Sequence, residues 1–542
     1  MGNDDKLKQL LLSAGLSLGL NIQESDVVLQ RTKDPSFGDY ASNIAMRFAK
    51  GLGKNPRDFA LEIIEKVQDP IIVKAEVAGP GFINFFLRAD AMSTVLKDVF
   101  EQGEAFGKAA PNGKKINIEY VSANPTGDLH LGHTRCAAVG DTIANILSHA
   151  GYDVTREFYV NDCGNQVEHL GISLRARYHE LFGEPLVLGD DDYHGQDLIA
   201  IAQSIKDQFG DKYLVDNQES HDFFIRFGID AELGKLKKDL ADFRVCFDRF
   251  SYESDIRKSG AVEKALTELT EKGYVYQSEG ATYLRTSDKL DDKDRPIVKS
   301  NGQYTYFMPD IGYHYDKMSR GYDLLIDILG ADHHGYINRM KSALMMKGYS
   351  ADSLEVELVQ IVRVFRDGAE VKMSKRTGKA IAHRDLVEDV GVDAVRYFFV
   401  ERSPSTHLDF NYNLATEQSS NNPVFYAQYA HARCCSLLHL GADIEIDETG
   451  ANLGNEQETA ILKHLASYPQ TILDAARDRA PYRICGYVHD LAGLVHEFYA
   501  HNRVIDRDNL PLTSSRLALV KAAKIVLSNA LAILGVSSPS KM

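Results

Sequence analysis

Two histidines three positions apart, His130 and His133, lie where a strand pattern gives way to a helix pattern. Before them, Lys115–Val121 alternates apolar and polar residues, as a half-buried strand does. After them, 134–149 has its apolar residues at helical spacing. Because a helix N-terminus favours an anion, we predict that both imidazoles contact a phosphate group and stabilise charge developing on it. The alternative is an ordinary turn with two surface histidines.

Three cations follow a predicted hairpin later in the chain. A strand expected over 358–365 leads into Asp367-Gly368, a dipeptide that favours a tight turn between two strands. The second strand then runs into Lys372-Met-Ser-Lys-Arg-Thr-Gly378, a polar loop that ends in glycine. Lysines on such a loop suit a polyphosphate, so Lys372 and Lys375 are candidate ligands. The alternative is a solvated basic turn.

The two loops together resemble the pair of signatures that marks class I aminoacyl-tRNA synthetases and related nucleotidyltransferases. The histidine loop is similar to the HIGH signature, with Leu131 in the isoleucine position. The lysine loop is similar to KMSKS, with Arg376 in place of the last serine. In this order along one chain, the pair is far more specific than either loop alone.

The elements that must position these loops form an α/β chain. A strand at Lys115–Val121, a helix and a second strand at Asp153–Val160 make a βαβ unit, which implies a parallel, Rossmann-type sheet. The pattern predicts an N-terminal α+β domain (1–108), the parallel-sheet catalytic domain (109–365) with an insertion near 171–299, a region that carries the second signature (366–420) and an all-helical C-terminal bundle (421–542).

Composition narrows the class of protein. A chain of 542 residues exceeds one core, so about two to four domains are expected. The net charge of -16 argues against a histone-like binder but permits a local basic face for nucleic acid. The 6 cysteines lack metal-binding spacing and indicate reduced thiols in a cytoplasmic protein without a zinc site. We expect no signal peptide and no membrane span, because no apolar run approaches about 18 residues.

Two surfaces are candidates for contact with RNA. In a strand at 82–87, Phe82 and Asn84 share one face and are predicted to stack on and read an unpaired base. The alternative is an edge strand with Phe82 in the core. Along the C-terminal helices, aromatic and basic side chains provide a second face, which includes Tyr429, Arg433, Tyr499 and Arg503. The alternative there is a bundle with tyrosines at its boundary.

Longer stretches are similar to the arginyl-tRNA synthetase family, over essentially the whole chain. They are Phe37–Asn43, Gly79–Asn84, Glu119–Gly127, Tyr159–Gln166, Gly330–Tyr336, Asn422–Arg433 and the C-terminal 534–542. The resemblance implies ATP-dependent charging of tRNA-Arg with L-arginine, in two steps through arginyl-adenylate, with Mg²⁺ as counter-ion and tRNA required for the first step. It also implies a monomer whose helical domain reads the anticodon and whose N-terminal domain contacts the outer corner of the tRNA.

The resemblance assigns roles to residues of this chain. Catalysis is expected from His130, His133, Lys372 and Lys375, and ATP binding from Gly132, His130, His133, Asp332, His333, Met373 and Ser374. Arginine binding is expected from Glu119, Asn124, His130, Tyr306 and Asp310. A guanidinium matches two carboxylates. Each of these residues also has an ordinary structural alternative: Glu119 could be a solvent-facing strand residue, Asp310 could be a helix N-cap, and Tyr306 could be a core residue. Asp332-His333-His334 invites a metal interpretation, but no fourth ligand is evident, so no metal ligands are expected.

Three alternatives remain from the sequence. A small-molecule nucleotidyltransferase shares the histidine loop, but such enzymes are usually shorter and lack a helical C-terminal domain. A non-catalytic tRNA-binding paralogue is disfavoured by the intact histidines and lysines. A class I synthetase of another amino acid specificity is the third, and two carboxylates without zinc ligands favour arginine over cysteine or methionine.

Overall fold

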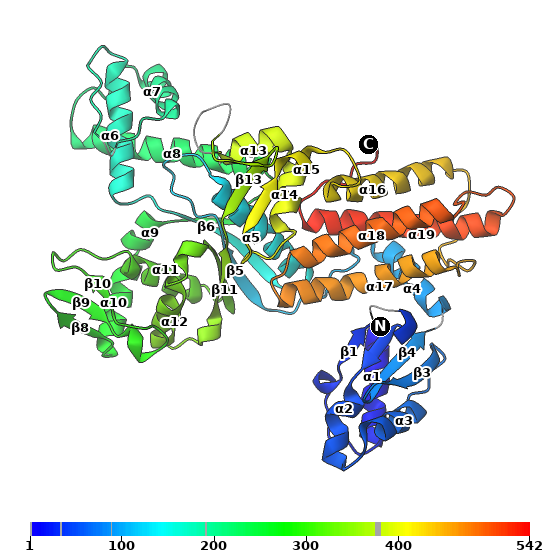
Figure 1. Ribbon diagram of the computed structural model, residues 1–542. Helices are drawn as coiled ribbons and strands as arrows, with labels where there is room; N and C mark the ends of the chain where they lie inside the picture. The colour runs from blue at the N-terminus through cyan, green and yellow to red at the C-terminus, as the bar shows by residue number, and fades with distance from the viewer. Residues whose placement is uncertain (1–2, 33–34, 88, 190–191, 374–380) are drawn as a thin grey trace.

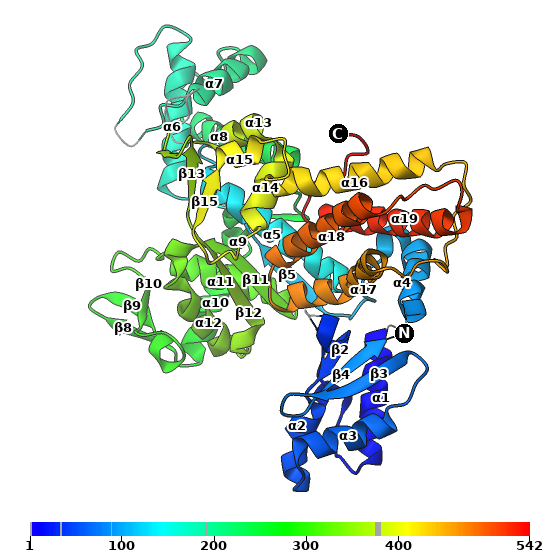
Figure 2. The same ribbon diagram turned by 45° about the vertical axis from the view of Figure 1, so that its right-hand side comes forward.

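The computed structural model describes residues 3–32, 35–87, 89–189, 192–373 and 381–542. Figures 1 and 2 show a small N-terminal α+β unit, a central sheet with helices, and long C-terminal helices that lie side by side. This confirms the predicted fold class. None of the helices in the described ranges combines the length and apolarity that a membrane span needs.

The N-terminal unit is an antiparallel sheet in the order β1-β2-β4-β3, packed against helices. Its strands are β1 (Leu29–Arg31), β2 (Tyr40–Ser42), β3 (Ile72–Ala78) and β4 (Phe82–Leu87), and its main helices are α1 (Asn3–Ser17), α2 (Ile44–Phe48) and α3 (Pro56–Lys66). Helix α3 begins at Pro56, where a missing N–H costs nothing, and the side chain of Asn55 accepts a hydrogen bond from the Arg57 N–H at 2.9 Å.

A parallel sheet in the order β12-β11-β5-β6-β7 forms the centre of the molecule. Its strands are β5 (Lys115–Glu119), β6 (Asp153–Val160), β7 (Arg249–Tyr252), β11 (Leu324–Gly330) and β12 (Leu354–Val359). Successive side chains of β5 point to opposite faces of the sheet, and a different helix packs on each face. Ile118 lies in the core with α5 (Leu131–His149), whereas Glu119 contacts α11 (Phe307–Ser319) on the other face.

Two helical segments and a small sheet are inserted between these strands. The first segment contains α6 (Asn165–Glu180), α7 (Gln196–Phe209) and α8 (Gln218–Asp242), and the second contains α9 (Glu253–Lys258), α10 (Ala261–Glu271) and the antiparallel strands β8 (Val275–Ser278), β9 (Ala281–Leu284) and β10 (Arg295–Val298). The continuous insertion expected near 171–299 is therefore wrong in one respect. Strand β7 lies inside it, yet pairs in parallel with β6 and completes the central sheet.

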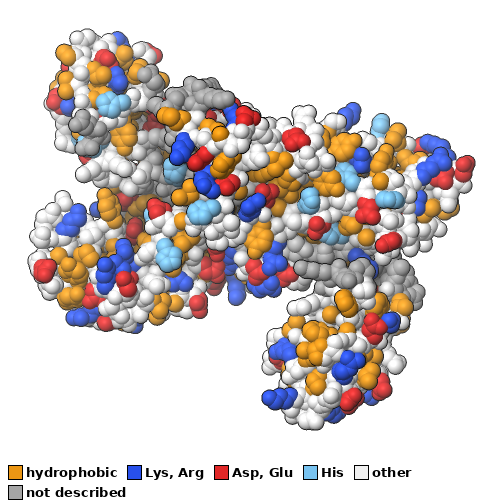
Figure 3. Space-filling view, in the orientation of Figure 1, with side chains coloured by type: hydrophobic (Ala, Val, Ile, Leu, Met, Phe, Trp, Pro, Cys, Tyr) orange, Lys and Arg blue, Asp and Glu red, His pale blue; other side chains and the backbone are white. Residues whose placement is uncertain are grey.

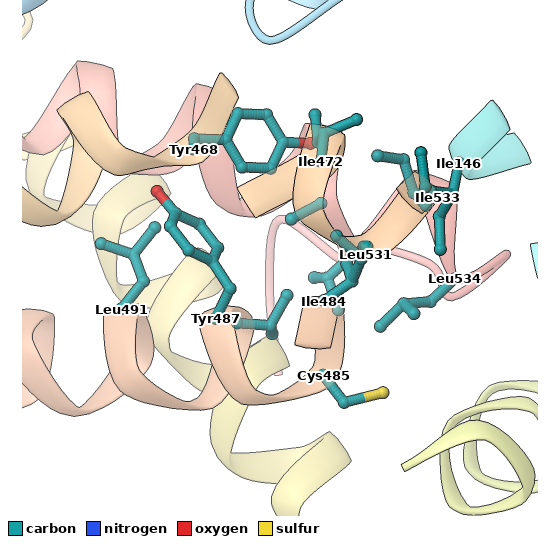
Figure 4. Packing of buried hydrophobic residues seen from close by; sticks show 14 of the residues in the cluster. Ile146, Tyr468, Ile472, Ile484, Cys485, Tyr487, Leu491, Leu531, Ile533 and Leu534 are labelled. Atoms are coloured by element: carbon teal, nitrogen blue, oxygen red, sulfur yellow. The ribbon is translucent and has the colours of Figure 1, made fainter. Parts of the chain in front are cut away.

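A fourth sheet, in the order β14-β13-β15, and the long helices make up the C-terminal half. Helix α12 (Tyr336–Lys347) comes before this half of the chain. The strands of the sheet are β13 (Val362–Arg366), β14 (Ala369–Val371) and β15 (Leu408–Asn411). The helices are α13 (His383–Val390), α14 (Val392–Val400), α15 (Tyr412–Thr416), α16 (Pro423–Leu440), α17 (Glu456–Arg477), α18 (Tyr482–His501) and α19 (Leu510–Ile533). Figure 4 shows that Ile146 of α5 packs beside Ile533 of α19. The core of the bundle is therefore continuous with that of the central sheet.

Two predicted boundaries differ from the structure. The strand expected over 358–365 is broken at Gln360, whose N–H donates to Pro404 O (2.9 Å) and whose carbonyl accepts from Arg135 Nη1 (2.8 Å), so β12 and β13 belong to different sheets. The sequence pattern predicts separate helices over 456–464 and 469–478, but these form one helix, α17, because its buried apolar side chains continue on both sides of Pro469. The predicted hairpin is confirmed, with positive φ at Asp367 (53°) and Gly368 (77°) between β13 and β14.

Candidate active site

The order of the central strands places a crevice beside β5. The chain leaves β5 toward β6 on one side, while β11 pairs with β5 on the other, so the direction of winding reverses between β5 and β11. Ligands of open parallel sheets bind at the carboxyl ends of the strands at such a point. The histidine loop follows β5, and Gly330–His334 follows β11, so both segments border this crevice.

The loop leaves β5 through strained backbone. Val121 (φ 70°) and Ser122 (φ 39°) both adopt left-handed conformations that are unfavourable for residues with a side chain. Ser122 is held by two hydrogen bonds, donating to Glu119 Oε1 at 2.9 Å and accepting from the Tyr159 N–H at 3.1 Å. Strain of this kind persists where surrounding contacts over-determine it, and it clusters at functional sites.

His130 and His133 form a stacked pair at the start of α5. His130 is the N-cap residue and His133 the third helical residue, so the helix begins three residues earlier than the 134–149 expected from the sequence. Nδ1 of each ring accepts the backbone N–H of the other residue at 3.3 Å, and the ring centroids are 3.6 Å apart. A side chain at Gly132 would lie 2.9 Å from the His130 ring, so this glycine permits the stacked arrangement.

This geometry determines what the two imidazoles can donate. Burial lowers the pKa of His130, and burial together with His130 lowers the pKa of His133 to about 4, so both rings are neutral at neutral pH. In a neutral imidazole whose Nδ1 accepts, the proton is on Nε2. Each ring therefore has one N–H directed away from the helix backbone and free to donate to an anion.

Three carboxylates lie abreast on the α11 face of the sheet. Glu119 of β5 is in register with Asp327 of β11 on one side and with Glu157 of β6 on the other. All three are buried, with exposures of 8%, 2% and 0%. Such a row is unstable unless cations and hydrogen-bond donors face it.

Helix α11 supplies those partners. Lys317, with no exposed surface, forms ion pairs with Glu119 Oε2 and with Asp327 Oδ1 (3.1 Å). Arg320, just after the helix, pairs with Glu157 Oε2 at 2.7 Å. Burial alone would raise the pKa of Glu157, but Lys317 and Arg320 lower it to about 2. The row is therefore charged and matched by cations.

Tyr313 is a site residue that the sequence analysis missed. Its hydroxyl lies 2.9 Å from Glu119 Oε2 and 2.9 Å from Glu157 Oε1, so it links two carboxylates of the row. By contrast, Tyr306, the tyrosine expected to contact arginine, is 90% exposed and its hydroxyl has no hydrogen bond with any described residue. Asp310, Tyr313 and Lys317 are polar residues three and four positions apart in a largely buried helix, so they share one face. This pattern in the sequence could have identified Tyr313.

Asp310 is the carboxyl group without a partner. Its side-chain oxygens form no hydrogen bond within the part of the chain that the structure describes, and the residue is half-buried. Burial raises the pKa of Asp310 to about 7, with Glu119 and Glu253 adding to the effect and His314 opposing it. His314 binds the Asp310 carbonyl through Nδ1 (2.8 Å) and Asp327 through Nε2 (2.9 Å).

The other predicted ligands lie on exposed segments. Asn124 donates to Gln166 Oε1 at 2.7 Å, and Lys372 and Met373 are exposed after β14. Asp332 and His333 are exposed and 3.8 Å apart, and Asp332 acts to raise the pKa of His130. Ser374 and Lys375, which were predicted to bind ATP or its leaving pyrophosphate, lie outside the described residues. Among the residues that are described, no group of three or more His, Cys, Asp or Glu side chains is arranged to hold a metal ion.

The two predicted RNA-contact faces differ in outcome. Asn84 is 2% exposed and β4 is an inner strand, so Asn84 and the half-buried Phe82 do not form the exposed pair that was expected. Strands β2 and β3 both pair with β4, one along each edge, so β4 is an inner strand of this sheet. The edge strand given as the alternative is excluded for the same reason.

In the helical bundle, Arg433 lies between two partly exposed rings, 4.8 Å from the centroid of Tyr429 and 4.3 Å from that of Tyr499. Its Nη1 is 2.9 Å from His496 Nδ1. Arg503 is largely exposed, and its ion-pair partner is Asp506 at 3.5 Å. Figure 3 shows cations and anions interspersed over the face it presents, so the net charge of -16 is not gathered into one acidic patch there.

Known proteins are similar to this chain over nearly its whole length. Family models match at 4–87 (arginyl tRNA synthetase N terminal domain), 95–434 (tRNA synthetases class I (R), catalytic domain) and 427–542 (DALR anticodon binding domain). The arginine–tRNA ligase of Bacillus subtilis is 47% identical over 549 residues, covering 99% of both chains. That of Geobacillus kaustophilus is 46% identical over 549 residues, again covering 99% of both. The arginyl-tRNA synthetase structure from Thermus thermophilus has the same fold, with a TM-score of 0.77, 22% identity and coverage of 99% of this chain and 100% of that one.

Proposed function

The chain belongs to the arginyl-tRNA synthetase family, and from this premise we propose how its residues join L-arginine to tRNA-Arg. It is an arginine–tRNA ligase with a class I catalytic domain and a helical anticodon-binding domain. Class I catalysis uses ATP. The reaction runs through arginyl-adenylate, with release of pyrophosphate, followed by transfer to tRNA and release of AMP.

The arginine pocket is formed by Asp310 and Glu119 at the carboxyl end of β5. The observation that carries this assignment is Asp310, a half-buried carboxyl group with a raised pKa and no ion-pair or side-chain hydrogen-bond partner among the described residues. An arginine guanidinium supplies the missing charge and several donors in a rigid plane. Lysine carries a compact ammonium without a planar fork of donors, so it does not fit carboxylates placed for a guanidinium and should be rejected.

Further groups complete the substrate site. Asn124 and His130 hold the α-amino and carboxylate end of arginine. Tyr306 contributes only if its side chain turns from solvent toward the pocket, whereas Tyr313 already contacts Glu119. Lys317 forms an ion pair with Glu119 and orients it, so the incoming guanidinium shares this carboxylate with a buried lysine.

The phosphates of ATP bind at the N-terminus of α5. The free Nε2–H groups of His130 and His133 donate to them, Gly132 permits close approach, and Lys372 and Lys375 neutralise the leaving pyrophosphate. The adenosine lies along Asp332, His333, Met373 and Ser374. Because the described residues contain no metal-ligand cluster, Mg²⁺ would be held mainly by the phosphates.

The remaining domains hold the tRNA. The domain boundaries that we propose are those of the sequence analysis, with 1–108 contacting the outer corner, 366–420 the acceptor stem and 421–542 the anticodon. Tyr429, Arg433 and Tyr499 form the platform on which an anticodon base stacks, with Arg503 nearby in the sequence. Phe82 remains a contact candidate for the D-loop, and Asn84 would need to become accessible. We further propose a monomer in the cytoplasm.

The test is arginine-dependent ATP–pyrophosphate exchange, with and without tRNA-Arg, with lysine as the matched substrate control. We expect exchange with arginine and none with lysine. Exchange that requires tRNA would mean that tRNA completes the site, and exchange without it would mean that the free protein already has the site assembled. Absence of exchange with arginine under both conditions would overturn the proposed pocket.

A further inference from the structure

One face of α8 contacts the segments on both sides of the active site. The contact residues are Glu232, Lys235 and Asp239, spaced three and four positions apart so that they lie on the same side of the helix. Helix α8 belongs to the first inserted segment and carries none of the residues assigned to arginine or ATP. Its contacts with the histidine loop therefore require a separate explanation.

Lys235 is the centre of this face. Its Nζ lies 3.0 Å from Asp128 Oδ1, 2.9 Å from Asp197 Oδ2 and 3.1 Å from Glu232 Oε2. The side chain of Lys235 is 20% exposed and that of Glu232 1%, so the ammonium is partly withdrawn from water. Because three acceptors surround one ammonium, the lysine side chain is held in one position more firmly than in an ordinary exposed ion pair.

Asp128 connects this cluster to the catalytic loop. It stands two residues before His130, and Leu129 between them is buried at 1% exposure. A hollow of about 750 Å³ lies beside the loop and is lined by Asp128, His130, Lys235 and Arg384, among others. The loop is therefore not packed on all sides there, and the ion pair between Asp128 and Lys235 lies at the wall of this hollow.

The same helix face also holds the segment after the lysine loop. Asp239 Oδ1 accepts from Arg384 Nη2 at 2.7 Å and from its Nε at 3.2 Å. Arg384 is the second residue of α13. Lys235 and Asp239, one turn apart on α8, thus contact the histidine loop and the helix that follows the lysine loop, respectively.

We propose that Lys235 is a positioning residue for adenylate formation, which acts by holding Asp128 and thereby the stacked His130 in place. The proposal rests on the phosphate-binding role proposed above for His130. Displacing reacting groups by about 1 Å can cost about 100-fold in rate. The alternative role for Lys235 is to tie α7 to α8 through Asp197, which would affect folding of the insertion without affecting the histidine loop.

Two variants separate these roles. Asp128→Asn removes the loop's carboxylate charge from an exposed position and leaves the Asp197 and Glu232 contacts intact. Lys235→Met removes the ammonium, and Lys235→Arg restores the charge. Lys238→Met is the matched control, because Lys238 lies on the same helix and pairs only with the exposed Asp242 among the described residues.

The measurements are kcat and KM for arginine in ATP–pyrophosphate exchange with tRNA present, together with thermal unfolding. We expect Asp128→Asn and Lys235→Met each to lower kcat about 10- to 100-fold, with KM for arginine unchanged. The double variant should be no slower than the slower single variant, Lys235→Arg should recover most of the rate, and Lys238→Met should match the wild type.

Wild-type kcat in Asp128→Asn would overturn the proposal, as would losses that multiply in the double variant. A lowered unfolding temperature in Lys235→Met with normal kcat in Asp128→Asn would assign Lys235 to folding alone. His130→Ala separates the positioning role of Lys235 from the phosphate-binding role proposed for the histidine pair. If it abolishes exchange while Asp128→Asn does not, only the positioning role fails; if it leaves exchange intact, the proposed role of the histidine pair fails as well.

Discussion

The hydroxyl of Thr134 lies 3.0 Å from Nδ1 of His383, joining the first turn of α5 to the first residue of α13. The backbone N–H of His383 also donates to the carbonyl of Leu129 at 2.7 Å, and Thr134 Oγ1 lies 3.1 Å from the carbonyl of His130. The ring of His383 is buried against Phe243. The histidine loop is therefore tied directly to the chain that follows the lysine signature, although 249 residues separate the two partners.

Removal of the Thr134 hydroxyl should slow adenylate formation. Thr134→Val keeps the shape but leaves His383 Nδ1 without its partner, so we expect a loss of about 1 kcal/mol in unfolding free energy and a lower single-turnover rate. Thr142→Val is the matched control on the same helix, because its buried hydroxyl has no hydrogen-bond partner among the described residues. Equal rates and stabilities for the two variants would mean that this bond does not couple the signatures.

Arginine binding should weaken as the pH falls below about 7. The raised pKa of Asp310, about 7, means that this carboxyl group takes up a proton in that range and loses its attraction for a guanidinium. KM for arginine should therefore be constant at higher pH and rise below pH 7, approaching about tenfold per pH unit. KM for ATP over the same range is the control. An arginine KM that does not change between about pH 6 and pH 8 would contradict the pKa assigned to Asp310.

Glu119→Gln should raise KM for arginine with little change in KM for ATP. The variant keeps the size of the side chain but removes a charge that both Lys317 and the substrate use. Loss of a charged hydrogen bond of about 1.5–3 kcal/mol corresponds to about 10- to 150-fold in KM. Steady-state exchange kinetics check this, and an unaltered arginine KM would remove Glu119 from the pocket.

Lys317→Met should destabilise the protein strongly. The change leaves Glu119 and Asp327 buried without their shared cation, and breaking such a pair costs about 3–5 kcal/mol. Denaturant unfolding measures the loss. An additional Asp327→Asn change should recover part of it, because one uncompensated charge is then gone. Lys238→Met, which loses only an exposed ion pair, should stay within about 0.5 kcal/mol of the wild type.

Arg433→Lys should weaken tRNA binding although it keeps the positive charge. A lysine lacks the planar group that lies over Tyr429 and Tyr499, so we expect a loss of about 1–2 kcal/mol, or about 5- to 30-fold in KM for tRNA. The control is Arg507→Lys, since Arg507 forms an exposed ion pair with Asp443. If both variants have the same KM for tRNA, the platform does not contact tRNA.

Local patterns in the sequence determined the elements that carry the chemistry. The spacing of apolar residues determines strand β5 and the helix that follows the histidines. Asp367-Gly368 determines the hairpin. Asn-Pro pairs determine the starts of α3 and α16, because the asparagines cap these helices. Each of these signals acts over a few neighbouring residues, so it can be recognised without knowing what packs against it. The family resemblance rests on the same local stretches.

Tertiary structure decided how charged and polar groups meet. The row of Asp327, Glu119 and Glu157 exists only because three strands distant in sequence pair in one register, and Asn84 lies on an inner strand because β2 and β3 pair with the two edges of β4. The tyrosine that contacts Glu119 is Tyr313, which lies in helix α11, whereas Tyr306 at the start of that helix faces solvent. Register and burial depend on contacts between distant segments, and a single sequence gives no measure of either.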